Sequence, residues 1–404
     1  MTAYWKNVSV VFSGAVLSQL IPVLGTFFIA RIYTPADYGA YSLWLAVVLI
    51  LAVILTLRYE AALALEKDGE ERAIAVVATL CIVLLVGVFA SLVLGFISLI
   101  FPELIQGFSS WALISIVPAG VFLSFNMAYQ GWAAADGRYS QLNALRLIFA
   151  GSVTLLQIAG GFVFASELTL LLMHTFGLFI SFCFAVYLNP VRIKSIKLIR
   201  YAMVLFWRRR RQFPIFSLPA DLTSTVAAQL PLIIVTSRFG SEVGGLLALT
   251  LRMLSAPIGL LGKAVLDVFK RYAVIEMNEA GSCKKIYIKT FKILCFGSLL
   301  LILGVLIFAE WFFIVAFGSE WGDAALYSMW LLPLFALRFI ASPLSYTVYI
   351  VEKQNWDLIW QIGFLFVTFS TLVVIEDFYL TMLVYTYACS LMYVIYLYMT
   401  FRLS

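Results

Sequence analysis

Eight ionisable residues lie inside, or close to the ends of, apolar stretches long enough to cross a lipid bilayer. They are Arg58, Glu60, Arg146, Asp221, Arg252, Lys263, Glu310 and Arg338. A charge that faces lipid near the bilayer centre costs about 2.5–3.5 kcal/mol. Asp221, Arg252 and Arg338 lie well inside predicted spans. Left unpaired, these three would together cost on the order of 10 kcal/mol, which is comparable to the whole folding free energy of a typical domain. We therefore expect the deepest of them to face a water-filled cavity or one another.

The basic members of this set outnumber the acidic ones. The cations are Arg58, Arg146, Arg252, Lys263 and Arg338. A cavity with that excess suits an anionic passenger, such as a phosphate or diphosphate head group, so we take these five as candidate substrate-binding residues. For Arg58 and Lys263, near predicted cytoplasmic helix ends, the alternative is snorkelling to the interface.

Arg252 and Lys263 are 11 residues apart, which on a regular helix places them on nearly one face, about 16 Å apart along the axis. The small residues Ser255, Ala256 and Gly259 share that face. Such a face could line a path for a bulky polar group. The alternative is close packing of helices through the same small residues.

Two acidic residues are candidates for ion coupling. Asp221 follows Pro219 in a span that contains further prolines, and a carboxylate beside a bent helix could bind a proton or a sodium ion. The alternative for Asp221 is a structural partner for Arg252 or Arg338. Glu60 follows Arg58 by two positions, so on a regular helix the two side chains point apart. No metal-ligand cluster, phosphate loop or catalytic constellation occurs in the sequence, so we expect no catalytic residue, no metal and no cofactor.

The elements that must position these residues are membrane spans. Hydrophobic residues make up 63% of the 404 residues and charged residues 12%, whereas soluble domains are about half apolar and about a quarter charged. A spanning helix needs about 20 mostly apolar residues. The sequence predicts an all-α integral membrane protein with twelve spans, at Val8–Ala30, Ala40–Ala64, Ala73–Phe101, Ala112–Ala133, Leu142–Phe164, Leu168–Leu188, Pro214–Ser237, Gly245–Leu266, Phe291–Phe317, Ala325–Val351, Leu358–Ile375 and Tyr379–Phe401.

The basic residues predict the orientation of these spans. With both termini in the cytoplasm, 20 of the 27 Lys and Arg residues fall in cytoplasmic segments or at their edge, and only Arg31 and Arg238 fall in external segments. The stretch Asn189–Gln212 holds eight basic residues and no acidic one, which marks it as a cytoplasmic connector. We expect a six-helix lobe at 1–188, the connector at 189–212 and a second six-helix lobe at 213–404. The net charge of +6 reports this orientation and not a nucleic-acid partner.

The two halves of the chain carry similar short motifs. Gln19-Leu20-Ile21-Pro22 precedes Arg31 and Gly39, and Gln229-Leu230-Pro231 precedes Arg238 and Gly244. Setting Gly39 on Gly244 also sets Arg58 on Lys263. With six spans per half the copies have the same orientation, which predicts lobes related by a pseudo-two-fold axis along the membrane normal.

Several of these stretches resemble one known family. The turn Ala30–Gly39, the segment Leu57-Arg58-Tyr59-Glu60-Ala61-Ala62 followed by Glu66-Lys67-Asp68, and the later stretches Leu254–Ile258 and Gly318–Trp321 look like signatures of bacterial polysaccharide repeat-unit flippases, of the type that moves O-antigen units. That family belongs to the multidrug/oligosaccharidyl-lipid/polysaccharide exporter superfamily. The order of these stretches along the chain is similar to the order of the signatures in the family.

The resemblance implies a function as well as a fold. It implies two lobes around a cationic central cavity that move an undecaprenyl-diphosphate-linked oligosaccharide, such as an O-antigen unit of lipopolysaccharide, to the outer leaflet of the bacterial inner membrane by alternating access. The resemblance assigns Arg58 to the cavity, because Arg58 lies in a matching motif. It implies only that a cavity of this family has a similar cationic lining for the other four, Arg146, Arg252, Lys263 and Arg338. It also implies ion-driven antiport, as is common in the superfamily, and partnership with polysaccharide polymerase and chain-length proteins.

Three other functions stay open at this stage. A drug or cation exporter of the same fold should carry more acid than base in its cavity. A membrane glycan polymerase or ligase would need a sizeable external loop, and no predicted external loop exceeds about ten residues. A cell-wall precursor flippase usually has extra helices, for which this length leaves no room.

Overall fold

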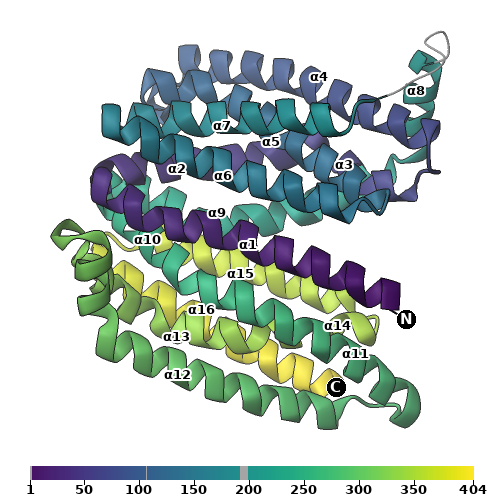
Figure 1. Cartoon of the computed structure of the whole chain (residues 1–404). Helices are drawn as coiled ribbons and strands as arrows, with labels where there is room; N and C mark the ends of the chain where they lie inside the picture. Colours follow the sequence, from purple (N-terminus) through teal and green to yellow (C-terminus); the bar gives the residue numbers. More distant parts are fainter. Residues whose placement is uncertain (1, 106, 192–198) are drawn as a thin grey trace. The chain divides into compact units, whose positions relative to one another are not determined.

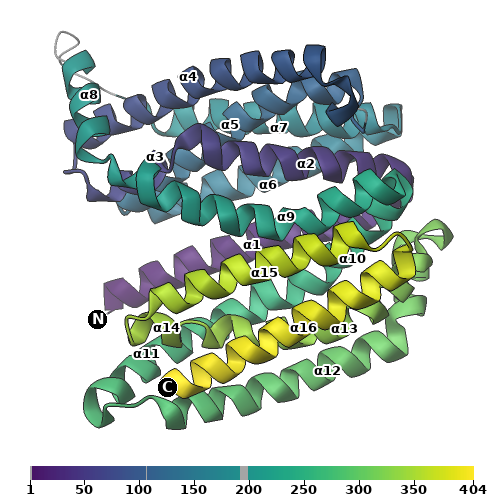
Figure 2. The same cartoon turned by 180° about the vertical axis from the view of Figure 1, so that it is seen from behind.

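The computed structural model describes residues 2–105, 107–191 and 199–404, and the side chains of residues 2–12, 104–105 and 263 lie outside that description. The described residues form helices and connecting turns, with no strand among them (Figures 1 and 2). Twelve helical segments are long and apolar enough to cross a membrane. The predicted number of spans is therefore confirmed.

The first compact unit comprises residues 1–229. Its helices are α1 (Thr2–Ile32), α2 (Pro35–Thr56), α3 (Tyr59–Ala62), η1 (Leu63–Leu65), α4 (Glu70–Ile100), η2 (Pro102–Ile105), α5 (Ser110–Ala135), α6 (Tyr139–Val163), α7 (Glu167–Leu188), α8 (Ile199–Arg209), the π-helical turn η3 (Phe213–Ser217) and the beginning of α9 (Leu218–Phe239). Helix α5 packs on α2, α4 and α7, and α6 packs on both α1 and α7. A core that includes Tyr59, Tyr129 and Phe206 closes one end of this bundle.

The second compact unit comprises residues 230–404. It contains the rest of α9, then α10 (Ser241–Pro257), the π-helical turn η4 (Ile258–Gly262), α11 (Lys263–Ala280), α12 (Lys284–Phe317), η5 (Ser319–Trp321), α13 (Asp323–Leu344), α14 (Thr347–Ile350), α15 (Gln354–Val374) and α16 (Phe378–Leu403). Helix α13 packs on α10, α12 and α16, and α15 packs on α16.

The two units repeat one order of packing. In each, the fourth span is central: α5 contacts α2, α4 and α7, and α13 contacts α10, α12 and α16. A repeated six-span unit, as the recurring sequence motifs suggest, would produce this pattern. The contacts divide the chain between Gln229 and Leu230, inside α9, so the expected lobe limits at 188 and 213 stay a prediction. Residues 192–198 of the expected connector lie outside the described residues.

The turn between α1 and α2 has a clear local cause. Pro35 occupies the first turn of α2, and Thr34 and Asp37 form a reciprocal capping box, in which each side chain accepts a hydrogen bond from the other's backbone. The hydroxyl of Tyr33 donates to the carbonyl of Gln157 on α6 at 2.8 Å, and Asp37 also accepts from the amide of Glu167 at 2.9 Å. The first family-like motif is thus a structural corner that fixes α2 against α6 and α7.

Candidate functional site

Arg58 lies at a break between two helices and not inside a span. Helix α2 ends at Thr56, and Leu57 and Arg58 both have left-handed backbone conformations, with φ of 46° and 63°. Non-glycine residues seldom adopt this conformation, and two in succession are costly unless the surroundings stabilise them. Helix α3 then begins at Tyr59. The predicted span Ala40–Ala64 is therefore too long, because the apolar pattern continues through the break.

This break brings both candidate coupling acids to Arg58. Its Nη1 donates to Oε1 of Glu60 at 2.8 Å, and its Nε lies 2.6 Å from Oδ2 of Asp221. The expectation that Arg58 and Glu60 point apart is wrong, because it assumed a continuous helix. Asp221 thus has Arg58 as an ionic partner, and its pairing with Arg252 or Arg338 stays a prediction.

The three members of this cluster differ in exposure. The side chain of Glu60 is 8% exposed, that of Arg58 25% and that of Asp221 42%. Oε2 of Glu60 is buried with no hydrogen-bond partner. With every group ionised the cluster has one more negative than positive charge.

Arg146 and Arg338 are two candidate cations with no acidic partner among the described residues. Arg146 is half-buried in α6. Arg338 is exposed on α13, where its guanidinium lies 5.8 Å from the centroid of the Phe335 ring. A guanidinium stays charged in proteins, so inside a span it needs water or an anion to solvate it. Their role in binding an anionic substrate stays a prediction.

Arg252 and Lys263 are not joined by one regular α-helix, so the prediction that they share a helical face loses its basis. The π-helical turn η4 lies between them and has a wider turn than an α-helix, so the regular periodicity behind the prediction is lost. Arg252 is half-buried in α10. The side chain of Lys263 lies outside the described residues, so its role stays a prediction.

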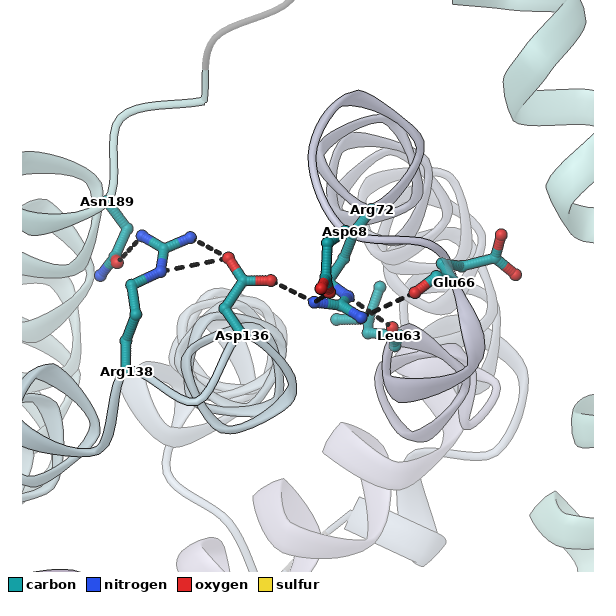
Figure 3. Close-up of polar contacts among 7 residues, drawn as sticks. All are labelled: Leu63, Glu66, Asp68, Arg72, Asp136, Arg138 and Asn189. Carbon is teal, nitrogen blue, oxygen red and sulfur yellow. Dashed lines mark hydrogen bonds and ion pairs between the residues drawn. The ribbon is translucent and has the colours of Figure 1, made fainter. Parts of the chain in front are cut away.

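Sequence reasoning missed a second ionic cluster, which Figure 3 shows at one end of the first unit. Arg72 is 4% exposed, pairs with Asp68 and Asp136, and donates to the carbonyl of Glu66 at 2.7 Å. Arg138 pairs with Asp136 as well and donates to Asn189 at 2.7 Å. The sequence signal for this cluster is the group of charged residues just outside the predicted spans. Those charges were used only to predict the orientation of the spans.

The electrostatics of this cluster centre on Asp136. Burial alone would raise the pKa of its carboxyl, but the hydrogen bonds and charges of Arg138 and Arg72 hold that pKa below its ordinary value of 3.8. The cluster ties the end of α5 to the beginning of α4 and, through Asn189, to the end of α7. We assign it a structural role.

A cavity within the second unit does not match the predicted site. It has a volume of about 350 Å³ and is lined almost wholly by apolar groups of α10, α12 and α13, among them Met253, Gly304, Phe308 and Trp311. None of the candidate site residues whose side chains the structure describes lines it. Such a lining offers no solvation for a diphosphate.

Two other polar residues of the spans have structural surroundings. His174 is buried, and its Nδ1 makes a hydrogen bond of 2.8 Å with the hydroxyl of Tyr41, so it is a packed residue. Glu310 is exposed near the end of α12.

The twelve apolar helices among the described residues define a multi-pass membrane protein. The chain belongs to the polysaccharide biosynthesis protein family, whose sequence profile matches residues 28–326. No curated protein sequence matches this chain.

Solved structures show the same fold. An inward-facing multidrug resistance MATE family transporter of the MOP superfamily superposes with a TM-score of 0.72 at 13% identity, covering 95% of this chain and 94% of that one. The lipid II flippase MurJ superposes with a TM-score of 0.69 at 15% identity, covering 98% and 87%. A MOP superfamily transporter from Pyrococcus furiosus, described as having a binding pocket of reverse polarity, gives 0.57 at 12% identity, covering 98% and 95%. The expected resemblance to a polysaccharide biosynthesis family and the expected fold class are confirmed.

Proposed function

We propose that this protein is a flippase that moves an undecaprenyl-diphosphate-linked oligosaccharide, an O-antigen unit or a similar surface glycan, from the cytoplasmic to the outer leaflet. The observation that carries this proposal is the pair Arg146 and Arg338, two guanidinium groups in spans with no acidic partner among the described side chains. The family match to polysaccharide biosynthesis proteins and the fold shared with a lipid II flippase support the same substrate class. The protein would work in the inner membrane with both termini in the cytoplasm, alongside polymerase and chain-length proteins.

Arg58 needs a different account from the other cations, because it is already neutralised. For Arg58 to bind a diphosphate, one of its two carboxylate partners must leave. Asp221 is the one that can do so, since 42% of its side chain is exposed against 8% for Glu60. A released Asp221 is no longer neutralised by Arg58 and is free to meet a cation. We propose that substrate binding at Arg58 and cation binding at Asp221 are coupled in this way.

The experiment uses the full chain in proteoliposomes with a fluorescent lipid-diphosphate oligosaccharide, and measures its appearance in the opposite leaflet. Arg146→Ala and Arg338→Ala should each slow this movement. Arg402→Ala is the control, because Arg402 is exposed at the end of α16 and donates to Tyr398. Movement at the wild-type rate in both span variants, with normal insertion, would falsify the proposal.

The same vesicles distinguish the proposed flippase function from that of a multidrug exporter. Such a protein shares the fold of this chain but should favour cationic passengers. We expect no transport of a cationic dye and no inhibition of glycolipid movement by that dye. Dye transport without glycolipid movement would favour the exporter.

A further inference from the structure

Helix α8 has two distinct faces. One face is docked on the first unit: Phe206 is 2% exposed in the core, Nε1 of Trp207 donates to the carbonyl of Ala78 on α4 at 3.2 Å, and Nε of Arg210 donates to Glu66 at 2.6 Å. Arg209 also pairs with Glu66, whose side chain is only 1% exposed. These contacts fix the rotation of α8 about its own axis.

The opposite face of α8 carries apolar side chains that the protein leaves uncovered. Tyr201, Val204 and Leu205 are 69%, 36% and 47% exposed. Together with Arg208 they follow the i, i+3, i+4, i+7 spacing of one helical face. A soluble protein would gain by burying or replacing such residues, so a different environment must cover this face.

The arrangement of α8 points to what that environment is. In Figures 1 and 2, α8 stands across the direction of α4 and α7 at one end of the first unit, and it projects past α4. Since α4 and α7 are membrane spans, a helix across them at their end lies along the membrane surface. Its projection past α4 carries it beyond the edge of the bundle, where lipid would surround the first unit.

The charge on α8 selects the type of lipid. Arg200 and Arg208 on α8 and Arg211, two residues after its end, are exposed, and no acidic partner for them occurs among the described residues. A basic amphipathic helix with aromatic and aliphatic residues on its free face is typical of helices that lie in the headgroup region. Basic residues attract the anionic lipids of the cytoplasmic leaflet, each contributing about 1 kcal/mol.

We infer that α8 is an interfacial helix that inserts Tyr201, Val204 and Leu205 among the acyl chains of the cytoplasmic leaflet and binds anionic phospholipid headgroups through Arg200, Arg208 and Arg211. This inference does not depend on what the protein transports. Through Glu66, the helix holds the segment between α3 and α4, which directly follows Arg58 and Glu60. Lipid composition would thereby affect the chain near the Arg58 cluster.

The test places a polarity-sensitive fluorophore on the free face. Leu205→Cys is labelled in the full-length protein after the exposed Cys183 is changed to Ser. In vesicles that contain phosphatidylglycerol, we expect blue-shifted emission that a quencher attached to the acyl chains reduces. In pure phosphatidylcholine vesicles the shift should be smaller. A matched label at Glu279→Cys, exposed at the end of α11, should show neither effect.

Charge variants separate the headgroup role from apolar burial. Changing Arg200, Arg208 and Arg211 to Gln should reduce the preference for bound phosphatidylglycerol over phosphatidylcholine, read by native mass spectrometry, by about 5-fold per residue, the equivalent of about 1 kcal/mol each. The matching Lys variants should retain most of it. Emission typical of water would overturn the inference. So would a blue shift that the lipid-borne quencher leaves unchanged, since a protein partner would then cover the face, or a shift equal in both lipids.

Discussion

Oδ2 of Asp221 lies 2.6 Å from Nε of Arg58, although Asp221 belongs to the seventh span and Arg58 follows the second. The contact joins a residue that we expected to bind substrate to one that we expected to bind an ion. It is an ion pair without the geometry of a hydrogen bond, because Nε of Arg58 has no hydrogen-bond partner. Such a contact is easier to exchange for another anion than the 2.8 Å hydrogen bond between Arg58 and Glu60.

The first prediction follows from this pair. Asp221→Asn removes the carboxylate that competes with the substrate, so the affinity for the lipid-linked diphosphate should rise while the dependence of transport on an imposed proton or sodium gradient falls. Its effect on stability should stay within about 1 kcal/mol, as for other partly exposed ion pairs. Glycolipid movement in proteoliposomes with and without each gradient measures both changes. Glu60→Gln is the comparison, and as a buried partner of Arg58 it should mainly lower stability. An Asp221→Asn protein with wild-type gradient dependence would remove Asp221 from coupling.

The second prediction concerns Arg338. A guanidinium can bind two phosphate oxygens at once, whereas an ammonium group acts as a point charge. Arg338→Ala should lower the apparent affinity for the glycolipid by about 10- to 100-fold, equivalent to the roughly 1.5–3 kcal/mol of a charge-assisted hydrogen bond. Arg338→Lys should fall between that variant and the wild type. Concentration dependence of glycolipid movement gives these affinities, and equal loss with Lys and Ala would indicate a packing role against Phe335 instead.

The third prediction concerns the buried ionic cluster. Asp136→Asn leaves Arg72 with less compensation in a buried site, and breaking such a pair costs about 3–5 kcal/mol. Because the folded-state pKa of Asp136 is lowered, its contribution is complete above the ordinary value of 3.8 and is lost as the pH falls through the folded-state value. The difference in thermal unfolding midpoint between wild type and Asp136→Asn in detergent should therefore shrink below pH 3.8. A difference independent of pH would contradict this account.

The fourth prediction tests the close packing of α6 on α7. A methyl group added at Gly177 would lie 2.7 Å from Cα of Val153, a backbone atom that cannot move without shifting α6. Gly177→Ala should destabilise the protein by about 1–3 kcal/mol, as overpacking does in other well-packed cores. Gly151→Ala is the control on α6, since nothing lies within 4 Å of the added group. Its unfolding midpoint should match the wild type, and equal midpoints for both variants would mean that the two helices separate easily.

The sequence by itself determined the class of the protein and its charged residues. Lipid imposes a simple rule, because each span must satisfy its own backbone hydrogen bonds over about 20 apolar residues, and Lys and Arg mark the cytoplasmic side. The number of spans and the fold class followed from that rule alone. The residues around Arg58 and Thr34 also indicated the polysaccharide biosynthesis family.

Only the tertiary structure decided which charges meet. The left-handed residues Leu57 and Arg58 and the π-helical turn η4 interrupt helices whose apolar pattern runs on without a break. Helical periodicity therefore placed Glu60 incorrectly relative to Arg58, and it is not regular between Arg252 and Lys263. Pairing of Asp221 with Arg58, and of Asp136 with Arg72 and Arg138, depends on contacts between distant segments. Hydropathy is averaged over a window, so it shows neither a break in a helix nor a contact between distant charged residues. A charge at a helix end contributes the same value whether water solvates it or another side chain pairs with it.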